Sequence, residues 1–165
     1  MKIYVASSWR NQYQPEVIKK LRDRGHQVYD FRHPVDNNDG FKWAEIDPAW
    51  ETWSASQFQK ALLHPLAEQG FKLDMEALKA ADAVILVLPC GRSAHLELGY
   101  AVGRKPTAIL LDGRNEPELM YKMVDHIARD ETSLFNWLGF SIPRADWHEA
   151  ALDMRSLWGP VNTRQ

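Results

Sequence analysis

The chain has 165 residues, of which 45% are hydrophobic, and 20 lysines and arginines against 22 acidic residues give a net charge of −2. This length and composition predict a single compact α/β domain over residues 1–165 with a full hydrophobic core. No block of lysines and arginines is present to bind the phosphate backbone, so the sequence gives no indication of binding to a nucleic-acid polymer.

Two further absences narrow the class of protein. No apolar run approaches the ~20 residues that span a bilayer, and the N-terminus has no long apolar signal segment. Cys90 is the single cysteine, which leaves no disulfide framework and is typical of a reducing compartment. We therefore expect a soluble, cytoplasmic protein with no membrane partner.

Motifs for metal or cofactor chemistry are absent as well. The sequence contains no HExxH, CxxC, P-loop or GxSxG motif, and its six histidines share no metal-ligand spacing. We therefore predict no metal and no cofactor.

The chain begins with a predicted strand–helix–strand unit. Strands are expected over residues 2–6 and 27–31, and a helix over residues 15–24 that stops at Gly25. This order and length predict a right-handed parallel crossover.

The turn after the first strand reads SSWRN and lies at the carboxyl edge of the predicted sheet, where such folds place ligands. Hydroxyl groups, backbone N–H groups and a guanidinium could hold a sugar or a phosphate here. Ser7, Trp9 and Arg10 are therefore candidate binding residues. Alternatively, Ser8 and Asn11 are helix-capping residues and the tryptophan packs a loop.

Residues 33–70 lose the hydrophobic alternation and contain Trp43, Trp50 and Trp53. A long loop inside a compact domain is normally functional or disordered, and three tryptophans argue against disorder. They form either a lid that stacks on a flat ligand or a surface buried against a neighbouring subunit. A helix is expected over residues 57–68.

A second helix is expected within residues 73–82, LDMEALKAAD, where Asp74 stands just before the apolar positions. This aspartate is either the N-cap of the helix or a second carboxylate near the carboxyl edge of the sheet.

Residues 83–111 form the unit around which the fold is expected to assemble. The apolar run at 83–88 predicts a strand buried on both faces, which ends at Pro89. A helix follows from Ser93 to near Gly103, and another strand is expected over residues 107–111.

Glu97 lies one turn into that helix among mostly apolar neighbours. Its carboxylate is either at the top of the sheet, near the helix N-terminus that favours its ionised form, or on the solvated side of the helix. Cys90, between strand and helix, either lines the site or is a small buried hydrophobe.

The remaining elements are expected to be short. Helices are expected over residues 115–124, 132–138 and 144–157, with a short strand at 127–128.

Several stretches together carry a resemblance to a known family. ELGYAVGRKP, the apolar strand before it, LDMEALKAADA and IYVASSW resemble the nucleoside 2-deoxyribosyltransferase family and its nucleotide N-glycoside hydrolase relatives, over residues 2 to about 138. The resemblance implies a flavodoxin-like, doubly wound, five-stranded parallel sheet flanked by helices.

The resemblance also implies roles for three side chains. Glu97 of ELGYA matches the family nucleophile, Tyr4 matches the tyrosine that hydrogen-bonds it, and Asp74 matches the acid that binds substrate and assists proton transfer. These roles suit cleavage of an N-glycosidic bond, where one carboxylate bonds to or stabilises the oxocarbenium-like sugar and another carboxyl group protonates the leaving base.

The chain departs from the family pattern at two positions before the nucleophile. Gly91 stands where many transferases carry an aspartate for the base, and His95 stands where glycine is frequent. The base preference is therefore not transferable, and the sugar acceptor is another base or water.

Two other functions remain open. Arg10, Arg92 and Ser93 suggest a nucleoside 5′-monophosphate N-glycoside hydrolase, and the third hypothesis is a non-catalytic nucleotide-binding module. The expected partners are a small nucleoside or nucleotide and a free nucleobase.

In the resemblance, a neighbouring subunit completes each site, so we expect a homodimer or a larger homo-oligomer. The position that reaches the sugar 5′ end is Glu118 here. A carboxylate there accepts a hydrogen bond from a free 5′-OH and repels a phosphate, which favours nucleosides. The alternative is a solvated glutamate in the first turn of a helix.

Overall fold

A five-stranded parallel sheet organises the fold in the computed structural model, which describes residues 1–113 and 117–139. The strand order is β2-β1-β3-β4-β5, which is the flavodoxin-like order. The strands are β1 Lys2–Ala6, β2 Gln27–Tyr29, β3 Ala83–Val87, β4 Thr107–Leu110 and β5 His126–Ala128. The predicted fold class is therefore confirmed.

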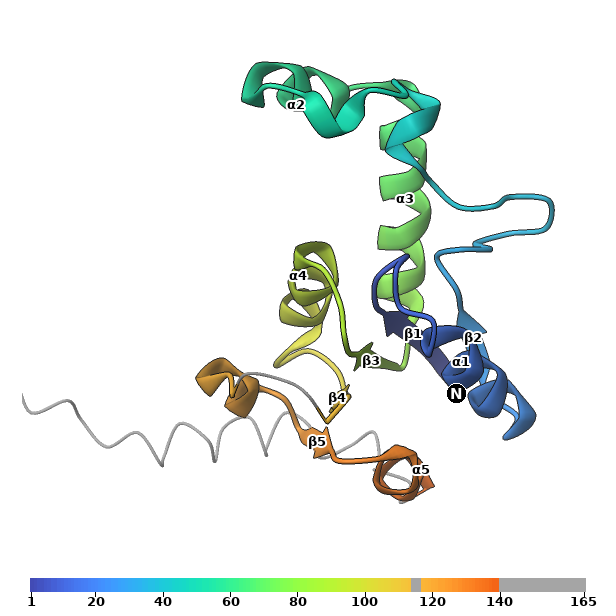
Figure 1. The fold of residues 1–165 in the computed structure, drawn as a ribbon. Coiled ribbons are helices and arrows are strands. Elements are labelled where there is room, and N and C mark those ends of the chain that lie inside the picture. Colours follow the sequence, from blue (N-terminus) through green and yellow to red (C-terminus); the bar gives the residue numbers. More distant parts are fainter. Residues whose placement is uncertain (114–116, 140–165) are drawn as a thin grey trace, which may run out of the picture.

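Five α-helices and three short 3-10 helices connect these strands in the described residues (Figure 1). They are α1 Gln14–Asp23, η1 Trp43–Glu45, η2 Trp50–Thr52, α2 Ala55–Ala61, α3 Pro65–Ala80, α4 Arg92–Ala101, η3 Leu119–Met123 and α5 Glu131–Gly139. Within residues 1–113 and 117–139, none of these helices has the length and apolarity that a membrane span needs.

The helices cover the sheet on both faces. Core side chains of α1 and α5 pack on one face, and those of α3 and α4 pack on the other. Every residue of β3 is buried, because this central strand has a helix layer on each side. This placement explains why its sequence, AVILV, is continuously apolar.

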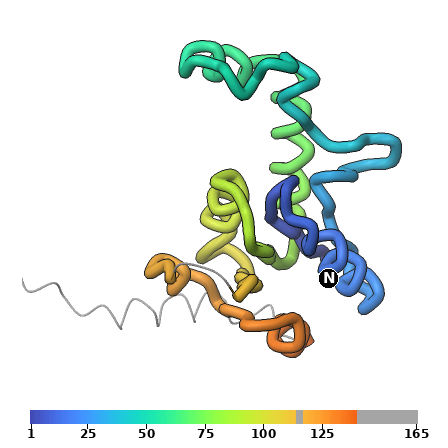
Figure 2. Tube along the Cα trace, in the orientation of Figure 1, coloured from blue at the N-terminus to red at the C-terminus, as the bar shows by residue number. Residues whose placement is uncertain are grey.

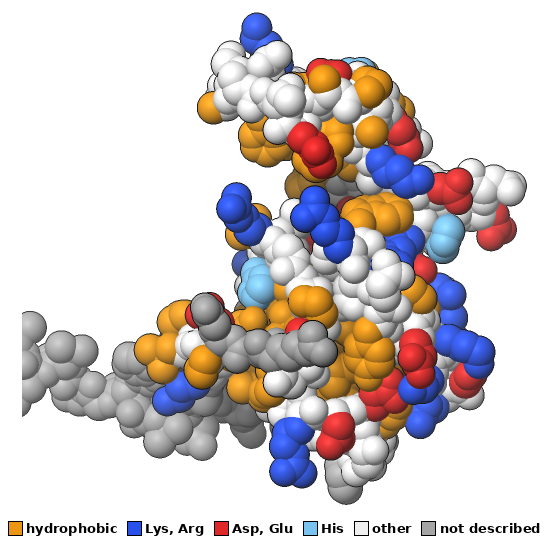
Figure 3. Space-filling model, in the orientation of Figure 1, with side chains coloured by type: hydrophobic (Ala, Val, Ile, Leu, Met, Phe, Trp, Pro, Cys, Tyr) orange, Lys and Arg blue, Asp and Glu red, His pale blue; other side chains and the backbone are white. Residues whose placement is uncertain are grey.

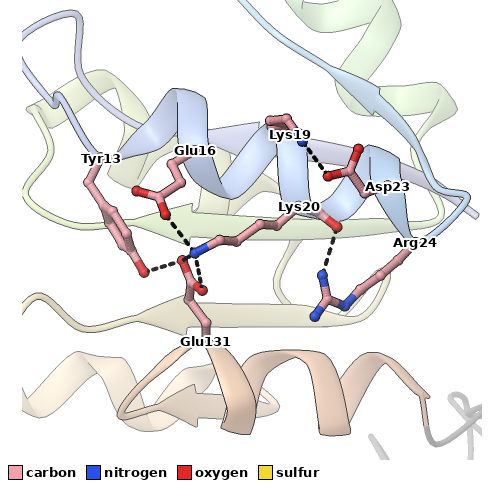
Figure 4. Close-up of polar contacts among 7 residues, drawn as sticks. All are labelled: Tyr13, Glu16, Lys19, Lys20, Asp23, Arg24 and Glu131. Carbon is pink, nitrogen blue, oxygen red and sulfur yellow. Dashed lines mark hydrogen bonds and ion pairs between the residues drawn. The ribbon is translucent and has the colours of Figure 1, made fainter.

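A polar network joins α1 to α5 on the first face (Figure 4). The Lys20 ammonium lies 2.7 Å from a carboxylate oxygen of Glu131 and 2.7 Å from one of Glu16. The Tyr13 hydroxyl donates to the same Glu131 carboxylate at 2.6 Å. These contacts fix the two helices against each other without involving the opposite face.

Two predicted helices prove to be different elements. The chain breaks its helix at Leu62–His64 and begins α3 at Pro65, so the helix expected over residues 57–68 is wrong. Proline disfavours helical backbone at the residue before it and suits the first helical turn. Asp74 therefore lies deep inside a 16-residue helix, and its interpretation as an N-cap is also wrong.

The helix expected over residues 115–124 is also wrong. Its described part contains only the 3-10 helix η3, which begins after Glu118 as its N-cap. The glutamate is thus not in the first turn of an α-helix. The helix expected over residues 144–157 lies outside the described residues.

The segment from η1 to the first turns of α3 extends away from the sheet (Figures 1 and 2). Hydrophobic side chains gather on this arm in the space-filling view (Figure 3). The large exposed ones are Phe58, Leu62, Leu63, Leu66 and Phe71. Only the later part of α3 packs on the sheet, through Leu78 and its neighbours.

Candidate active site

Three elements bring the predicted catalytic side chains together on the α3–α4 face of the sheet. Tyr4 lies on β1, Asp74 on α3 and Glu97 on α4. Each is electrostatically coupled to the others, since both carboxylates raise the pKa of the Tyr4 hydroxyl and Asp74 raises that of Glu97. Residues separated by 93 positions in the chain therefore form one cluster.

Glu97 is the most perturbed carboxyl group of the cluster. Burial, followed by the nearby charge of Asp74, raises its pKa to about 7. A hydrogen-bond interaction with Tyr4 acts in the opposite direction and lowers it. A carboxyl group that titrates near neutral pH suits a site where protons move.

Asp74 has a partner that the sequence reasoning missed. The Tyr29 hydroxyl donates a hydrogen bond of 2.8 Å to Asp74 Oδ1. Burial raises the pKa of Asp74, and this hydrogen bond lowers it. Tyr29 lies beside Tyr4 in the register of β1 and β2, so both side chains point to the same face. That register was the signal that could have found it.

The two tyrosine rings stack. Their centroids are 5.3 Å apart and the planes differ by 17°. Tyr4 is fully buried, yet its hydroxyl lacks a hydrogen bond of complete geometry in the described part of the chain. The hydroxyl nevertheless interacts with Glu97, because this interaction lowers the pKa of the Glu97 carboxyl group.

The position of α3, which carries Asp74, is fixed at its end. The Lys105 ammonium donates to the carbonyl oxygens of Leu78, Lys79 and Ala81 at 2.7–3.0 Å. These carbonyls have no partner within the helix, and a cation is favourable there. The lysine of the GRKP stretch thus has a structural role in holding the helix.

A small cavity of about 90 Å³ opens beside the cluster. Its lining includes Tyr29 and Asp74, together with Glu45 and Gln69 from the arm and Phe41 just before it. A larger cavity of about 710 Å³ lies along β2 and contains none of the three predicted catalytic residues. Of the three predicted catalytic residues, Asp74 lines the smaller cavity, and Glu97 and Tyr4 do not.

The turn SSWRN is held from several sides. The Ser7 hydroxyl donates to the Val87 carbonyl at 2.8 Å and accepts from Asn11 at 3.0 Å. The Arg32 guanidinium donates to three backbone carbonyls of the turn, at 2.7–3.1 Å. The Ser7 hydroxyl is therefore engaged within the fold. Ser8 and Asn11 accept bonds within the turn and do not cap α1.

Trp9 lies over a glycine. A Cβ atom at Gly40 would lie 2.8 Å from the Trp9 ring, and the φ angle of +71° also favours glycine there. The indole packs edge-on against Phe31 and is 42% exposed. The Lys42 ammonium and the Arg32 guanidinium also lie over this ring, 5.6 and 5.8 Å from its centroid, so the indole has a packing role within the fold.

The other predicted binding residues lie on the surface around the cluster. Gly91, Arg92 and Ser93 are exposed at the start of α4, and Arg10 is exposed in the turn after β1. In the described residues, neither guanidinium forms a hydrogen bond or ion pair through its side chain. Glu118 is exposed at the start of η3, and its charge acts on Tyr121.

Cys90 lies close to Glu97 but does not suit a nucleophile. Burial, followed by the charge of Glu97, raises the pKa of the thiol to about 12. Its sulfur lies 3.5 Å from His95 Nδ1, and His95 Nε2 lies 3.0 Å from the Tyr121 hydroxyl. The departure from glycine at position 95 thus links α4 to η3.

Two of the three tryptophans of the arm, Trp43 and Trp53, contact each other. Trp43 packs edge-on against Trp53 and Phe58, with ring centroids 5.7 Å apart in each pair. The Trp53 indole donates to Asp47 at 2.6 Å. Trp43, Trp53 and Phe58 thus form an aromatic cluster within the arm, and both uses of the tryptophans, as a lid on a ligand or as a contact with a neighbouring subunit, stay predictions. Among the described residues, no cluster of histidine, cysteine and carboxylate side chains could hold a metal ion.

We compared the chain with families, curated proteins and solved structures. No family model and no curated protein matches the chain. Among solved structures, a 2-deoxyribosyltransferase from the psychrotolerant bacterium Bacillus psychrosaccharolyticus matches with a TM-score of 0.52 and 24% identity, over 82% of this chain and 91% of that one. The chain has the fold of a 2-deoxyribosyltransferase. The resemblance in the sequence and this structural likeness name the same kind of protein.

Proposed function

We propose that this chain cleaves the N-glycosidic bond of a (deoxy)ribonucleoside and passes the sugar to another base or to water. The observation that carries the proposal is the pair of partly buried carboxyl groups, Glu97 and Asp74, beside the stacked tyrosines. The similar structure is a biocatalyst for the synthesis of nucleosides, which supports the substrate class.

The carboxyl pair suits the two roles that the reaction needs. Burial, and then the nearby charge of Asp74, raise the pKa of Glu97 to about 7, so its ionised and neutral forms are both populated near neutral pH. In the first step, the Asp74 carboxyl group donates its proton to the leaving base while the C1′–N bond breaks. A Glu97 carboxylate oxygen forms a bond to C1′, and Tyr4 orients that carboxylate.

The second step releases the sugar. A nitrogen of an acceptor base, or a water molecule, attacks C1′ and displaces Glu97, and its proton passes to Asp74. Transfer and hydrolysis therefore share the same first step and differ in the acceptor. A lid that excludes water favours transfer, and the arm beside the cavity is the candidate for this role.

The direct test is turnover of a substrate panel. The wild type is incubated with four deoxynucleosides and their 5′-monophosphates, with and without adenine or cytosine as acceptor, and released bases and new nucleosides are separated by chromatography. New nucleosides indicate transfer, and free base without acceptor indicates hydrolysis. No release from any compound would contradict the proposal and favour the non-catalytic binding module.

A specific feature favours the 5′-monophosphate hydrolase as a second candidate. Arg10 and Arg92 follow adjacent strands, β1 and β3, and both guanidinium groups lie on the surface without a side-chain partner in the described residues. Such a pair beside the N-terminus of α4 could bind a phosphate. Faster turnover of monophosphates in the panel would support this candidate.

We also propose that the chain works as a homodimer or a larger homo-oligomer. Four large apolar side chains on α4 and η3 are between 47% and 77% exposed, which is a liability for a monomer. They are Leu96, Leu119, Met120 and Met123. Light scattering is expected to show a multiple of the 19.0-kDa chain, and the single-chain mass alone at micromolar concentration would contradict this.

A further inference from the structure

Tyr29 holds one oxygen of the Asp74 carboxyl group and leaves the other oxygen free. Its hydroxyl donates to Oδ1 at 2.8 Å. Within residues 1–113 and 117–139, Asp74 forms no other hydrogen bond or ion pair. The two oxygens of this carboxyl group are therefore not equivalent, and Oδ2 is the one available to a ligand.

The ring of Tyr29 is fixed, so its hydroxyl is a rigid anchor. It stacks on the fully buried ring of Tyr4, with centroids 5.3 Å apart. The two residues are partners in the register of β1 and β2, which sets their relative height. The hydrogen bond joins an edge strand to the middle of α3, two elements that are 45 positions apart in the chain.

We propose that Tyr29 is a positioning residue that turns the Asp74 carboxyl group so that Oδ2 faces the leaving base. This inference rests on the proposed function, in which Asp74 supplies the proton. The proton on Oδ2 passes to the base nitrogen as the C1′–N bond breaks, and Oδ1 keeps its hydrogen bond from the tyrosine. Tyr29 itself exchanges no proton with the substrate.

The test compares substrates that differ in their need for an acid. A deoxynucleoside needs protonation of its base, whereas 4-nitrophenyl 2-deoxyriboside has a leaving group that departs as an anion. For Tyr29→Phe, kcat/KM is expected to fall roughly tenfold to hundredfold for the deoxynucleoside. It is expected to change less than threefold for the nitrophenyl compound, because the nucleophile remains in place.

Two control variants accompany Tyr29→Phe in this comparison of the two substrates. Asp74→Asn is expected to show the same selectivity for the leaving group with a larger loss. Tyr13→Phe removes another tyrosine–carboxylate hydrogen bond, that to Glu131, and is expected to leave both substrates unaffected. An equal loss on both substrates for Tyr29→Phe, or no loss on either, would overturn the positioning role.

A second measurement needs no turnover. Carboxyl ¹³C NMR follows the titration of Asp74, which faces Tyr29 from β2, Tyr4 from β1 and Glu97 from α4. Loss of the Tyr29 hydrogen bond is expected to move the Asp74 midpoint upward, since that bond favours the ionised form. An unmoved midpoint would overturn this inference, whereas a wild type without turnover would contradict only the proposed function.

Discussion

Gly70 of α3 lies directly against Phe41, at the point where the arm meets the helix that carries Asp74. A Cβ atom at Gly70 would lie 2.8 Å from the Phe41 Cβ, closer than real side chains approach. Glycine within a helix lowers stability by about 1 kcal/mol relative to alanine. Glycine is nevertheless present at position 70, because a larger side chain would collide with Phe41. The contact forms one wall of the small cavity beside Asp74.

The first prediction follows from this contact. Gly70→Ala is expected to lower the free energy of unfolding by about 1 kcal/mol or more, because the collision outweighs the gain in helix propensity. Gly99→Ala in α4 is the matched control, since nothing lies within 4 Å of its added Cβ, and it is expected to be neutral or stabilising. Urea unfolding of both variants measures the difference. Equal changes in the free energy of unfolding for the two variants would contradict this prediction, because Phe41 would then move aside without cost.

The raised pKa of Glu97 predicts how stability depends on pH. The folded chain keeps a proton on Glu97 up to about pH 7, whereas the unfolded chain releases it near the ordinary value of 4.5. The stability associated with the neutral carboxyl group is therefore present at low pH and is lost as the pH rises through 7. Glu97→Gln is expected to be more stable than wild type at pH 8, by about 1–3 kcal/mol.

Two comparisons test whether the pH dependence of stability comes from Glu97. The advantage of Glu97→Gln is expected to fade at pH 5, where the wild-type carboxyl group is also neutral. Glu76→Gln, on the exposed side of α3, is expected to show no such pH dependence. A constant advantage at both pH values, or none at pH 8, would mean that burial of Glu97 does not disfavour its charge.

Tyr4→Phe is expected to separate activity from stability. Among the described residues, the buried Tyr4 hydroxyl has no hydrogen-bond partner, so its removal is expected to leave stability unchanged or to raise it. It is also expected to lower kcat/KM by about tenfold, because in the proposed reaction this hydroxyl donates to the Glu97 carboxylate and orients it. Steady-state kinetics and thermal unfolding measure the two effects. A loss as complete as that of Glu97→Ala would assign the tyrosine a different role.

Glu118 is expected to favour nucleosides over their 5′-monophosphates. Its exposed carboxylate lies at the start of η3 and would sit beside a phosphate of like charge in a neighbouring subunit's site. Glu118→Ser is expected to narrow or reverse the ratio of the two kcat/KM values. Glu51→Ser, on the arm, is the control that keeps the change in charge. A wild type that prefers the monophosphate about tenfold would instead support the hydrolase.

Much of the fold was predictable because its signals are local. The continuous apolar run of β3 and the helical spacing after it predicted the central strand and α4 correctly, and left two positions open for the Glu97 carboxylate. Boundaries within 57–82 were not predictable in the same way. The sequence predicts one helix over 57–68 and another within 73–82, whereas α3 runs from Pro65 through Gly70 to Ala80, with Phe41 packed against that glycine.

The partner of Asp74 could not be found by the same local reasoning. A tyrosine on a short apolar strand is usually a core residue, and only the pairing of β2 with β1 places Tyr29 beside Tyr4. The hydrogen bond to α3 spans 45 positions, and no spacing within one element indicates it. The resemblance named the carboxyl groups, and tertiary structure was needed to show what holds them.

The central claim is that Glu97 bonds covalently to the sugar, and trapping tests it most directly. The wild type is incubated with a 2-deoxy-2-fluoro nucleoside, whose fluorine slows hydrolysis of the intermediate, and peptides are then mapped by mass spectrometry. The mass of the fluorinated sugar is expected on Glu97, and neither adduct nor turnover is expected in Glu97→Ala. An adduct on Asp74, or near-normal turnover by Glu97→Ala, would contradict it.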